Sequence, residues 1–411
     1  MDTVRHLKKG EIVRVTGPAR IQMQTGHIRI DGVDKSKHVI KEGQSCTVEG
    51  VQESDIKCVL GSKAHIKEYT TLQAPRMWLK YAHVILQEPG ITMVLGGPDT
   101  GKTTFTTFLV NKALEKGLSV AVIDSDIGQS DIGAPGTIGL SYVKHTITRL
   151  SQVEVDGFYF VGTTSVLLKD VSDMVLGLCH LVSKAKKKAD IILIDTCGYI
   201  TGDTGRKLKM TKLQCINPDF VIGLQKKNEL HPILRNWHKK VFEVEIPTQV
   251  KQVSRQSRRE IRKSRWKKAF VGAQERRVDL EEKYLLNTFL LSGTIVDTHM
   301  FKKLLHCKVL HAEEIPEGFL VIKKDVFNEY NPPDVEVSGD TLRVLDYGWE
   351  KNLVVGLLKD GECIDVGILK RINYKNMMAV IYCKVHEFDG IKFGRIQVDE
   401  SGDEKGFIDW C

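Results

Sequence analysis

The sequence has no long hydrophobic run. Its 411 residues contain no uninterrupted apolar stretch long enough for a transmembrane helix, which needs about 18 residues or more. The first residues, Met1 to Leu7, also lack the apolar core of a secretory signal peptide. We therefore expect a protein with no membrane segment and no evident targeting signal.

Short cysteine spacings are also absent. The nine cysteines include no Cys-x-x-Cys pair and no spacing suited to a zinc site. An odd number of scattered cysteines in a chain of this length favours free thiols in a reducing compartment, and we expect a cytoplasmic protein. Cys197 lies inside a motif discussed below, and we interpret its side chain as a small buried hydrophobe.

No internal repeat or low-complexity segment is present, and the length of 411 residues favours two or three domains. Residues 1–75 predict an N-terminal β-rich domain, because apolar and polar residues alternate between glycine turns. Residues 291–411 predict a C-terminal β-rich domain for the same reason. The candidate strands are 12–15, 21–23 and 28–30 in the first domain, and 342–345, 353–355, 366–369 and 379–382 in the last.

Residues 76–290 have a different pattern, in which continuous apolar runs alternate with longer helical segments. The runs are 91–95, 120–123, 158–161, 191–194 and 220–224. Strands that are apolar on both faces are typical of a parallel sheet covered by helices, so the fold class is α/β. Ligands of such sheets bind at the carboxyl ends of the strands.

A complete phosphate-binding loop follows the first of these runs. Residues 96–103 match GxxxxGK[ST] at every fixed position, with a strand before and a helix after. The loop's backbone N–H groups predict a nucleotide phosphate site, in which Lys102 reaches the outer phosphates and the Thr103 hydroxyl binds Mg²⁺. The predicted ATP-binding residues are Gly96, Gly97, Pro98, Asp99, Thr100, Gly101, Lys102, Thr103 and Thr104.

Two aspartate positions compete for the roles of metal ligand and base. Asp195 ends the run 191–194, as the metal-binding aspartate of many P-loop proteins does, whereas Asp124 and Asp126 follow the strand after the P-loop helix. A kinase needs a carboxylate near the acceptor hydroxyl as well as one near the metal. Gln129, in the glycine-rich loop after Asp126, is either a substrate contact or an ordinary loop residue.

Two further segments have a composition suited to a polynucleotide. Thr196-Cys197-Gly198-Tyr199 follows the strand of Asp195, where Tyr199 either stacks on a nucleobase or packs at the rim. The net charge is +8, and residues 251–268 contain nine lysines and arginines with Glu260 as the only acid. Helical spacing there predicts a narrow apolar face of Ile261, Trp266, Ala269 and Phe270. This helix is a lid over the phosphoryl group, a nucleic-acid-binding helix or a solvated charged face.

The ordered set of motifs resembles the polynucleotide 5′-hydroxyl kinase family. That family includes the kinase of the eukaryotic pre-mRNA cleavage machinery, ribosomal-RNA processing kinases, and compact archaeal and bacterial relatives. The matching segments are 96–103, 124–129, 135–136, 196–199 and 258–265, and the flanking β-rich domains fit the family's three-part layout. The resemblance implies ATP as phosphoryl donor, Mg²⁺, and 5′-hydroxyl RNA as acceptor, with DNA as a second candidate acceptor.

The resemblance also implies a role for each matching residue. The catalytic residues it implies are Lys102, Asp126, Arg258 and Arg262. The metal ligands are Thr103, Asp124 and Asp126. The substrate contacts are Gln129, Thr163, Thr164, Thr196, Gly198, Tyr199 and Arg259. The N-terminal domain is expected to help hold the adenine.

The sequence departs from the family at two positions. The family more often has Trp where this chain has Tyr199, which should still stack, but more weakly. Val253 stands where some relatives have an arginine, and Arg255 is a candidate substitute. The hypothesis is an ATP- and Mg²⁺-dependent kinase of polynucleotide 5′-hydroxyl ends. The alternatives are an ATP-binding scaffold without catalysis and a P-loop enzyme acting on a small metabolite.

Overall fold

The computed structural model describes residues 2–42, 45–69, 73–235, 237–246, 254–324, 334–337 and 340–408. They divide into two compact units. The first comprises Met1–Asp124, Leu140–Asp156 and Val182–Gln252, and the second comprises Ser125–Gly139, Gly157–Leu181 and Val253–Cys411. The domain boundaries expected from the sequence, 1–75, 76–290 and 291–411, stay a prediction.

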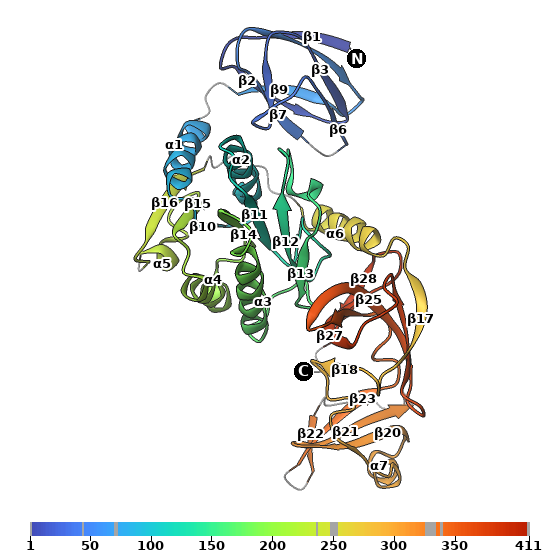
Figure 1. Cartoon of the computed structure of the whole chain (residues 1–411). Helices are drawn as coiled ribbons and strands as arrows, with labels where there is room; N and C mark the ends of the chain where they lie inside the picture. Colours follow the sequence, from blue (N-terminus) through green and yellow to red (C-terminus); the bar gives the residue numbers. More distant parts are fainter. Residues whose placement is uncertain are drawn as a thin grey trace. The chain divides into compact units, whose positions relative to one another are not determined.

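The N-terminal strands of the first unit form two antiparallel sheets (Figure 1), with strand orders β1-β8-β3-β6 and β5-β4-β7-β2-β9. Alternate residues such as Val13 and Val15 are fully buried, which confirms the strands expected from the period-two pattern. The strands are β1 (Asp2–Leu7), β2 (Ile12–Thr16), β3 (Ala19–Thr25), β4 (Ile28–Ile30), β5 (Val33–Asp34), β6 (Lys37–Ile40), β7 (Ser45–Gly50), β8 (Ser54–Leu60) and β9 (His65–Tyr69).

The rest of the first unit is built on a sheet with the order β12-β11-β14-β10-β15-β16. The pairs β10–β14, β10–β15 and β15–β16 are parallel, and every residue of β10, β11, β14 and β15 is buried, as the apolar runs predict. The strands are β10 (Ile91–Gly96), β11 (Val120–Ser125), β12 (Thr137–Val143), β14 (Ile191–Thr196), β15 (Phe220–Gln225) and β16 (Lys240–Glu245). The helices are α1 (Gln73–Gln87), α2 (Lys102–Glu115), η1 (Leu150–Gln152), α4 (Gly202–Ile216) and α5 (His231–Leu234).

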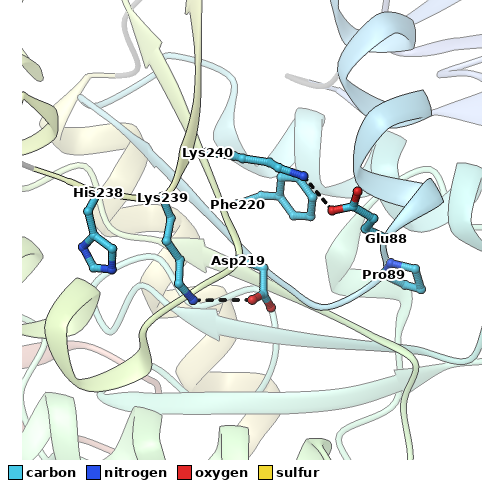
Figure 2. A pocket seen from close by; sticks show the side chains of 7 residues that line it. All are labelled: Glu88, Pro89, Asp219, Phe220, His238, Lys239 and Lys240. Carbon is cyan, nitrogen blue, oxygen red and sulfur yellow. Dashed lines mark hydrogen bonds and ion pairs between the residues drawn. The ribbon is translucent and has the colours of Figure 1, made fainter.

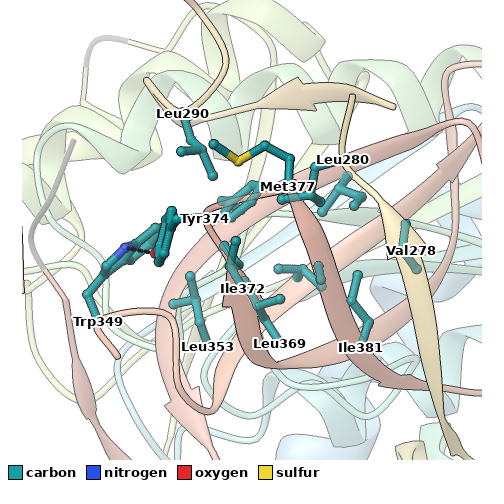
Figure 3. Packing of buried hydrophobic residues seen from close by; sticks show 14 of the residues in the cluster. Val278, Leu280, Leu290, Trp349, Leu353, Leu369, Ile372, Tyr374, Met377 and Ile381 are labelled. Carbon is teal, nitrogen blue, oxygen red and sulfur yellow. Dashed lines mark hydrogen bonds between the residues drawn. The ribbon is translucent and has the colours of Figure 1, made fainter. Parts of the chain in front are cut away.

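The second unit contains two further mixed sheets. Their orders are β17-β26-β25-β24-β27-β18, with β28 beside β27, and β19-β20-β21-β23-β22. Figure 3 shows the apolar core that includes Leu353, Leu369 and Ile381. The strands are β13 (Gly157–Phe160), β17 (Gln274–Asp279), β18 (Tyr284–Leu286), β19 (Thr294–Ile295), β20 (Lys308–Ile315), β21 (Gly318–Lys324), β22 (Asp334–Val337), β23 (Asp340–Asp346), β24 (Leu353–Lys359), β25 (Glu362–Asn373), β26 (Met378–Cys383), β27 (Gly390–Val398) and β28 (Glu404–Phe407).

The basic segment forms helix α6 (Arg255–Ala269), as its spacing predicts. Trp266 and Phe270 are buried with their rings stacked at 5.8 Å, within a cluster that includes Phe160 and Val354. Ile261 is 39% exposed, so its predicted place in the apolar face is wrong. The remaining helices are α3 (Asp170–Ala185) and α7 (His299–Leu305).

The described residues agree with one simpler expectation. The eight cysteines among them, Cys197 included, are free thiols, and Cys197 is buried as expected. No helix within the described ranges has the length and apolarity needed to cross a membrane.

Candidate phosphoryl-transfer site

The P-loop joins the end of β10 to the start of α2 in the first unit. Asp99 and Gly101 adopt left-handed conformations, with φ of 58° and 91°, which turn successive backbone N–H groups toward one side of the loop. Only glycine fits at position 96, since a Cβ there would lie 2.5 Å from the Thr100 hydroxyl oxygen. The loop and the N-terminus of α2 together form the expected cradle for a phosphate.

Lys102 lies within this cradle. Its side chain is largely buried, and its Nζ donates a hydrogen bond of 2.7 Å to the Gly97 carbonyl oxygen. The ammonium group is therefore held beside the loop's own backbone. A cation in this place suits the outer phosphates of a nucleotide.

The P-loop threonine contacts the aspartate that ends β14. The Thr103 hydroxyl donates a hydrogen bond of 2.6 Å to Oδ2 of Asp195, which is buried at the carboxyl end of β14. Asp124 is buried at the end of the neighbouring strand β11. The set of implied metal ligands, Thr103, Asp124 and Asp126, omitted Asp195. A hydroxyl and carboxylates are the hard oxygen ligands that Mg²⁺ prefers, so these residues fit that ion.

The turn after β14 lies against the P-loop. The Thr196 hydroxyl donates to the Val94 carbonyl of β10 at 2.7 Å. A Cβ at Gly198 would lie 2.7 Å from the backbone nitrogen of Pro98, so only glycine allows this approach. Tyr199 is 38% exposed, which leaves part of its ring accessible for stacking. The predicted clasp residues and the phosphate loop therefore lie together within one unit.

Sequence reasoning missed the lysine behind this turn. Lys209 of α4 is fully buried, and its Nζ donates to the Cys197 carbonyl at 2.5 Å and lies 3.3 Å from the Cys197 sulfur. Its position on α4 gives no local signal, because its partner lies in a different element.

The remaining predicted residues belong to the second unit, beginning with Asp126. Its Oδ1 accepts backbone N–H bonds from Gly128 at 3.1 Å and Gln129 at 3.0 Å, which fixes the orientation of the carboxylate. The Gln129 side-chain amide donates to the Gly128 carbonyl at 2.9 Å and to the Arg258 carbonyl at 3.5 Å. The predicted base, loop glutamine and arginine helix therefore lie side by side.

Thr163 and Thr164 lie close to this loop. A Cβ at Gly128 would be 3.0 Å from the Thr164 carbonyl oxygen. Thr163 is buried, and its hydroxyl is engaged within its own turn, donating to the Ser165 carbonyl at 2.9 Å. Substrate contact by these two threonines stays a prediction.

Two arginines of α6 have acidic partners in the same unit. Arg262 donates from Nε and Nη2 to the two carboxylate oxygens of Glu404, at 2.8 and 3.0 Å. Arg265 pairs with Asp131. Arg259 is exposed and reaches the Glu404 carbonyl oxygen at 3.4 Å. Val253, the position of the missing family arginine, lies outside the described residues.

A hollow of about 670 Å³ lies at the opposite, amino-terminal edge of the first unit's sheet (Figure 2). Its lysines are paired with acids, since Lys240 contacts Glu88 at 2.6 Å and Lys239 contacts Asp219 at 3.5 Å. Ligands of parallel sheets bind at the other edge, where the P-loop lies. We therefore assign the chemistry to the P-loop edge.

Comparison with known proteins agrees with this assignment. Residues 96–272 match the family model of the mRNA cleavage and polyadenylation factor CLP1 P-loop. The polyribonucleotide 5′-hydroxyl-kinase of Pyrococcus abyssi is 34% identical over 331 residues, which cover 79% of this chain and 92% of that protein. The kinase of the same name from Methanocaldococcus jannaschii is 34% identical over 334 residues, covering 79% and 91%.

The solved structure of a wild-type Clp1p–Pcf11p complex has a similar fold. Its TM-score is 0.62 at 11% identity, with 97% of this chain and 98% of that chain covered, so it supports the α/β fold with additional β-rich regions. The two kinases are similar in sequence to this chain over almost their whole length. The chain therefore belongs to the polyribonucleotide 5′-hydroxyl-kinase family.

Proposed function

We propose that this protein transfers the γ-phosphoryl group of ATP to the 5′-hydroxyl end of RNA. The observation that carries the proposal is the Thr103–Asp195 contact of 2.6 Å beside a complete P-loop, in a chain of this kinase family. A hydroxyl and a carboxylate held at this position are the protein's part of a nucleotide–metal site. Magnesium bound there would neutralise charge on the phosphates.

The acceptor oxygen needs a base. We assign this role to Asp126, because backbone N–H groups of Gly128 and Gln129 hold one of its oxygens and so orient the carboxylate. The 5′ oxygen forms a bond to the γ-phosphorus while the bond from that phosphorus to the β–γ bridging oxygen breaks. Asp126 receives the hydroxyl proton, and ADP leaves. Lys102 and the arginines of α6 stabilise charge on the transferring oxygens.

The RNA end needs a contact that tolerates any base. Tyr199 supplies an accessible ring in the turn that also holds Thr196 and Gly198. Stacking on an aromatic ring binds all four bases, which suits a kinase that recognises a chemical end rather than a sequence. We therefore place the terminal nucleotide against this turn.

The test is phosphoryl transfer from γ-labelled ATP to a 5′-hydroxyl RNA oligonucleotide. Wild type should label the RNA, and a 5′-phosphorylated oligonucleotide of the same sequence should stay unlabelled. Lys102→Ala and Asp126→Asn should each lower transfer by about 100-fold or more, with Asp126→Asn still binding ATP. Wild-type protein that binds ATP but labels no RNA would refute the proposal. A DNA oligonucleotide of the same sequence measures preference for the sugar.

A further inference from the structure

An acidic turn, residues 399–403, leads into strand β28 and packs against helix α6, the arginine helix. Gly402 has a left-handed φ of 84°, and a Cβ there would lie 2.5 Å from the Lys263 carbonyl oxygen. Beside it, Glu404 accepts from Arg262 at 2.8 and 3.0 Å and from the Trp266 indole at 3.4 Å. The turn is therefore fitted to α6 by both shape and charge.

The Arg262–Glu404 pair differs from an ordinary surface ion pair. Its side chains are 21% and 12% exposed, and the two parallel bonds form the fork geometry in which a carboxylate fixes a guanidinium plane. Nearby, Lys263 meets Asp403 through a single bond of 2.6 Å, with 47% and 33% exposure. The first pair is built to orient a side chain, whereas the second has the features of a weak exposed contact.

The guanidinium keeps donors for another ligand. Of its five N–H groups, Glu404 uses one on Nε and one on Nη2. The other three point along the remaining edges of the planar group. A carboxylate behind an arginine can therefore hold it in place while its outer edge binds phosphoryl oxygens.

The same helix is linked to the predicted base. Arg258 lies one turn before Arg262, and both are half-buried on one face of α6. The Arg258 carbonyl accepts the Gln129 amide at 3.5 Å, and the Gln129 backbone N–H binds Asp126 at 3.0 Å. Fixing Arg262 also fixes the register of the helix beside this loop.

We propose that Glu404 is the positioning residue of the phosphoryl-transfer arginine, so that the C-terminal β-rich part of the chain sets the geometry of the reaction. This inference rests on the proposed function. Glu404 does not touch the substrate and acts through Arg262. The kinase should therefore lose rate, rather than ATP affinity, when Glu404 is changed.

The experiment measures steady-state transfer from γ-labelled ATP to 5′-hydroxyl RNA by the full chain. Glu404→Gln keeps the shape but replaces one accepting oxygen with a donor, so kcat should fall about tenfold or more while KM for ATP changes little. Asp403→Asn is the matched control on the Lys263 pair, and its kcat should stay near wild type. Glu404→Asp keeps the charge but shortens the side chain, and it replaces Glu404→Gln in the same measurement if that variant does not fold.

A double-mutant cycle separates positioning from a merely structural role. In an Arg262→Ala background, Glu404→Gln should cause no further loss of rate, because the group through which it acts is gone. An equal loss in both backgrounds, or a Glu404→Gln enzyme as fast as wild type or faster, would overturn the inference. The proposed function fails separately, if wild type transfers no phosphoryl group or Lys102→Ala is fully active.

Discussion

Replacing Gly198 with alanine should damage the site by steric overlap alone. Gly198 is not among the glycines with a left-handed φ, so alanine causes no backbone strain there. Its new Cβ would lie 2.7 Å from the Pro98 nitrogen and 2.8 Å from the Pro98 Cα. Ordinary contact begins at 3.4 Å, so the turn or the P-loop must move by about 0.7 Å. Both atoms belong to backbone, which cannot swing away as a side chain does.

This displacement should appear mainly in catalysis. Overpacking of this size costs about 1–3 kcal/mol of stability. A shift approaching 1 Å at a reacting centre costs up to about 100-fold in rate. We expect kcat/KM for ATP to fall by about 10- to 100-fold in the transfer assay, with a modest fall in the melting temperature.

The matched comparison is Gly97→Ala in the same segment. A Cβ at Gly97 would meet Ile200 at 3.6 Å and Thr100 at 3.7 Å, which is ordinary contact. Its effect on kcat/KM should therefore be much smaller than that of Gly198→Ala. Equal losses of kcat/KM in the two variants, or wild-type kinetics in Gly198→Ala, would refute this steric argument.

Three other changes test different parts of the molecule. Tyr199→Ala should raise KM for RNA by about 5- to 100-fold, the value of one lost base stack, and leave the melting temperature unchanged; an unchanged KM would exclude stacking. Arg395→Met should lower unfolding stability by about 3–5 kcal/mol in urea titrations, because it leaves the Asp170 carboxylate buried without its 2.6 Å partner; a loss below 1 kcal/mol would contradict this. Burial raises the pKa of Glu350, so the folded protein holds this carboxyl proton more tightly than the unfolded chain does, and unfolding stability falls as pH rises above about 4.5. Glu350→Gln should make that fall shallower in urea midpoints measured from pH 4 to 8. An unchanged pH dependence would assign the fall to other groups.

The parts of the fold that the sequence predicts best are those with local causes. Strands β10, β11, β14 and β15 are buried on both faces, so their apolar character is continuous and readable without a structure. The P-loop is equally local, because its left-handed residues, tight glycines and lysine lie within eight positions, residues 96–103. Helix α6 was readable from its spacing.

Contacts between distant segments had no such signal. Glu404 lies 142 positions from Arg262, and nothing around it marks it as a partner of the arginine helix. The contact between Asp195 and Thr103 needed the structure, since Asp124 also ends a buried strand and the sequence does not show which side chains meet. Ile261 was misplaced because the apolar face of a helix depends on what packs against it. The cluster around Trp266 and Phe270 leaves that side of α6 exposed.

Helix α6 carries two sets of cations with different chemistry. Arg262 and Arg265 are half-buried, and each has a carboxylate partner from a distant segment. Lys267 and Lys268 are exposed at the end of the helix. A guanidinium held by a carboxylate keeps one orientation, whereas an exposed lysine samples many rotamers. The first set therefore suits a fixed role at one phosphoryl group, and the second suits attraction of a polynucleotide from any direction. We therefore expect this single basic run to perform two tasks, with the acidic partners deciding which residue performs which.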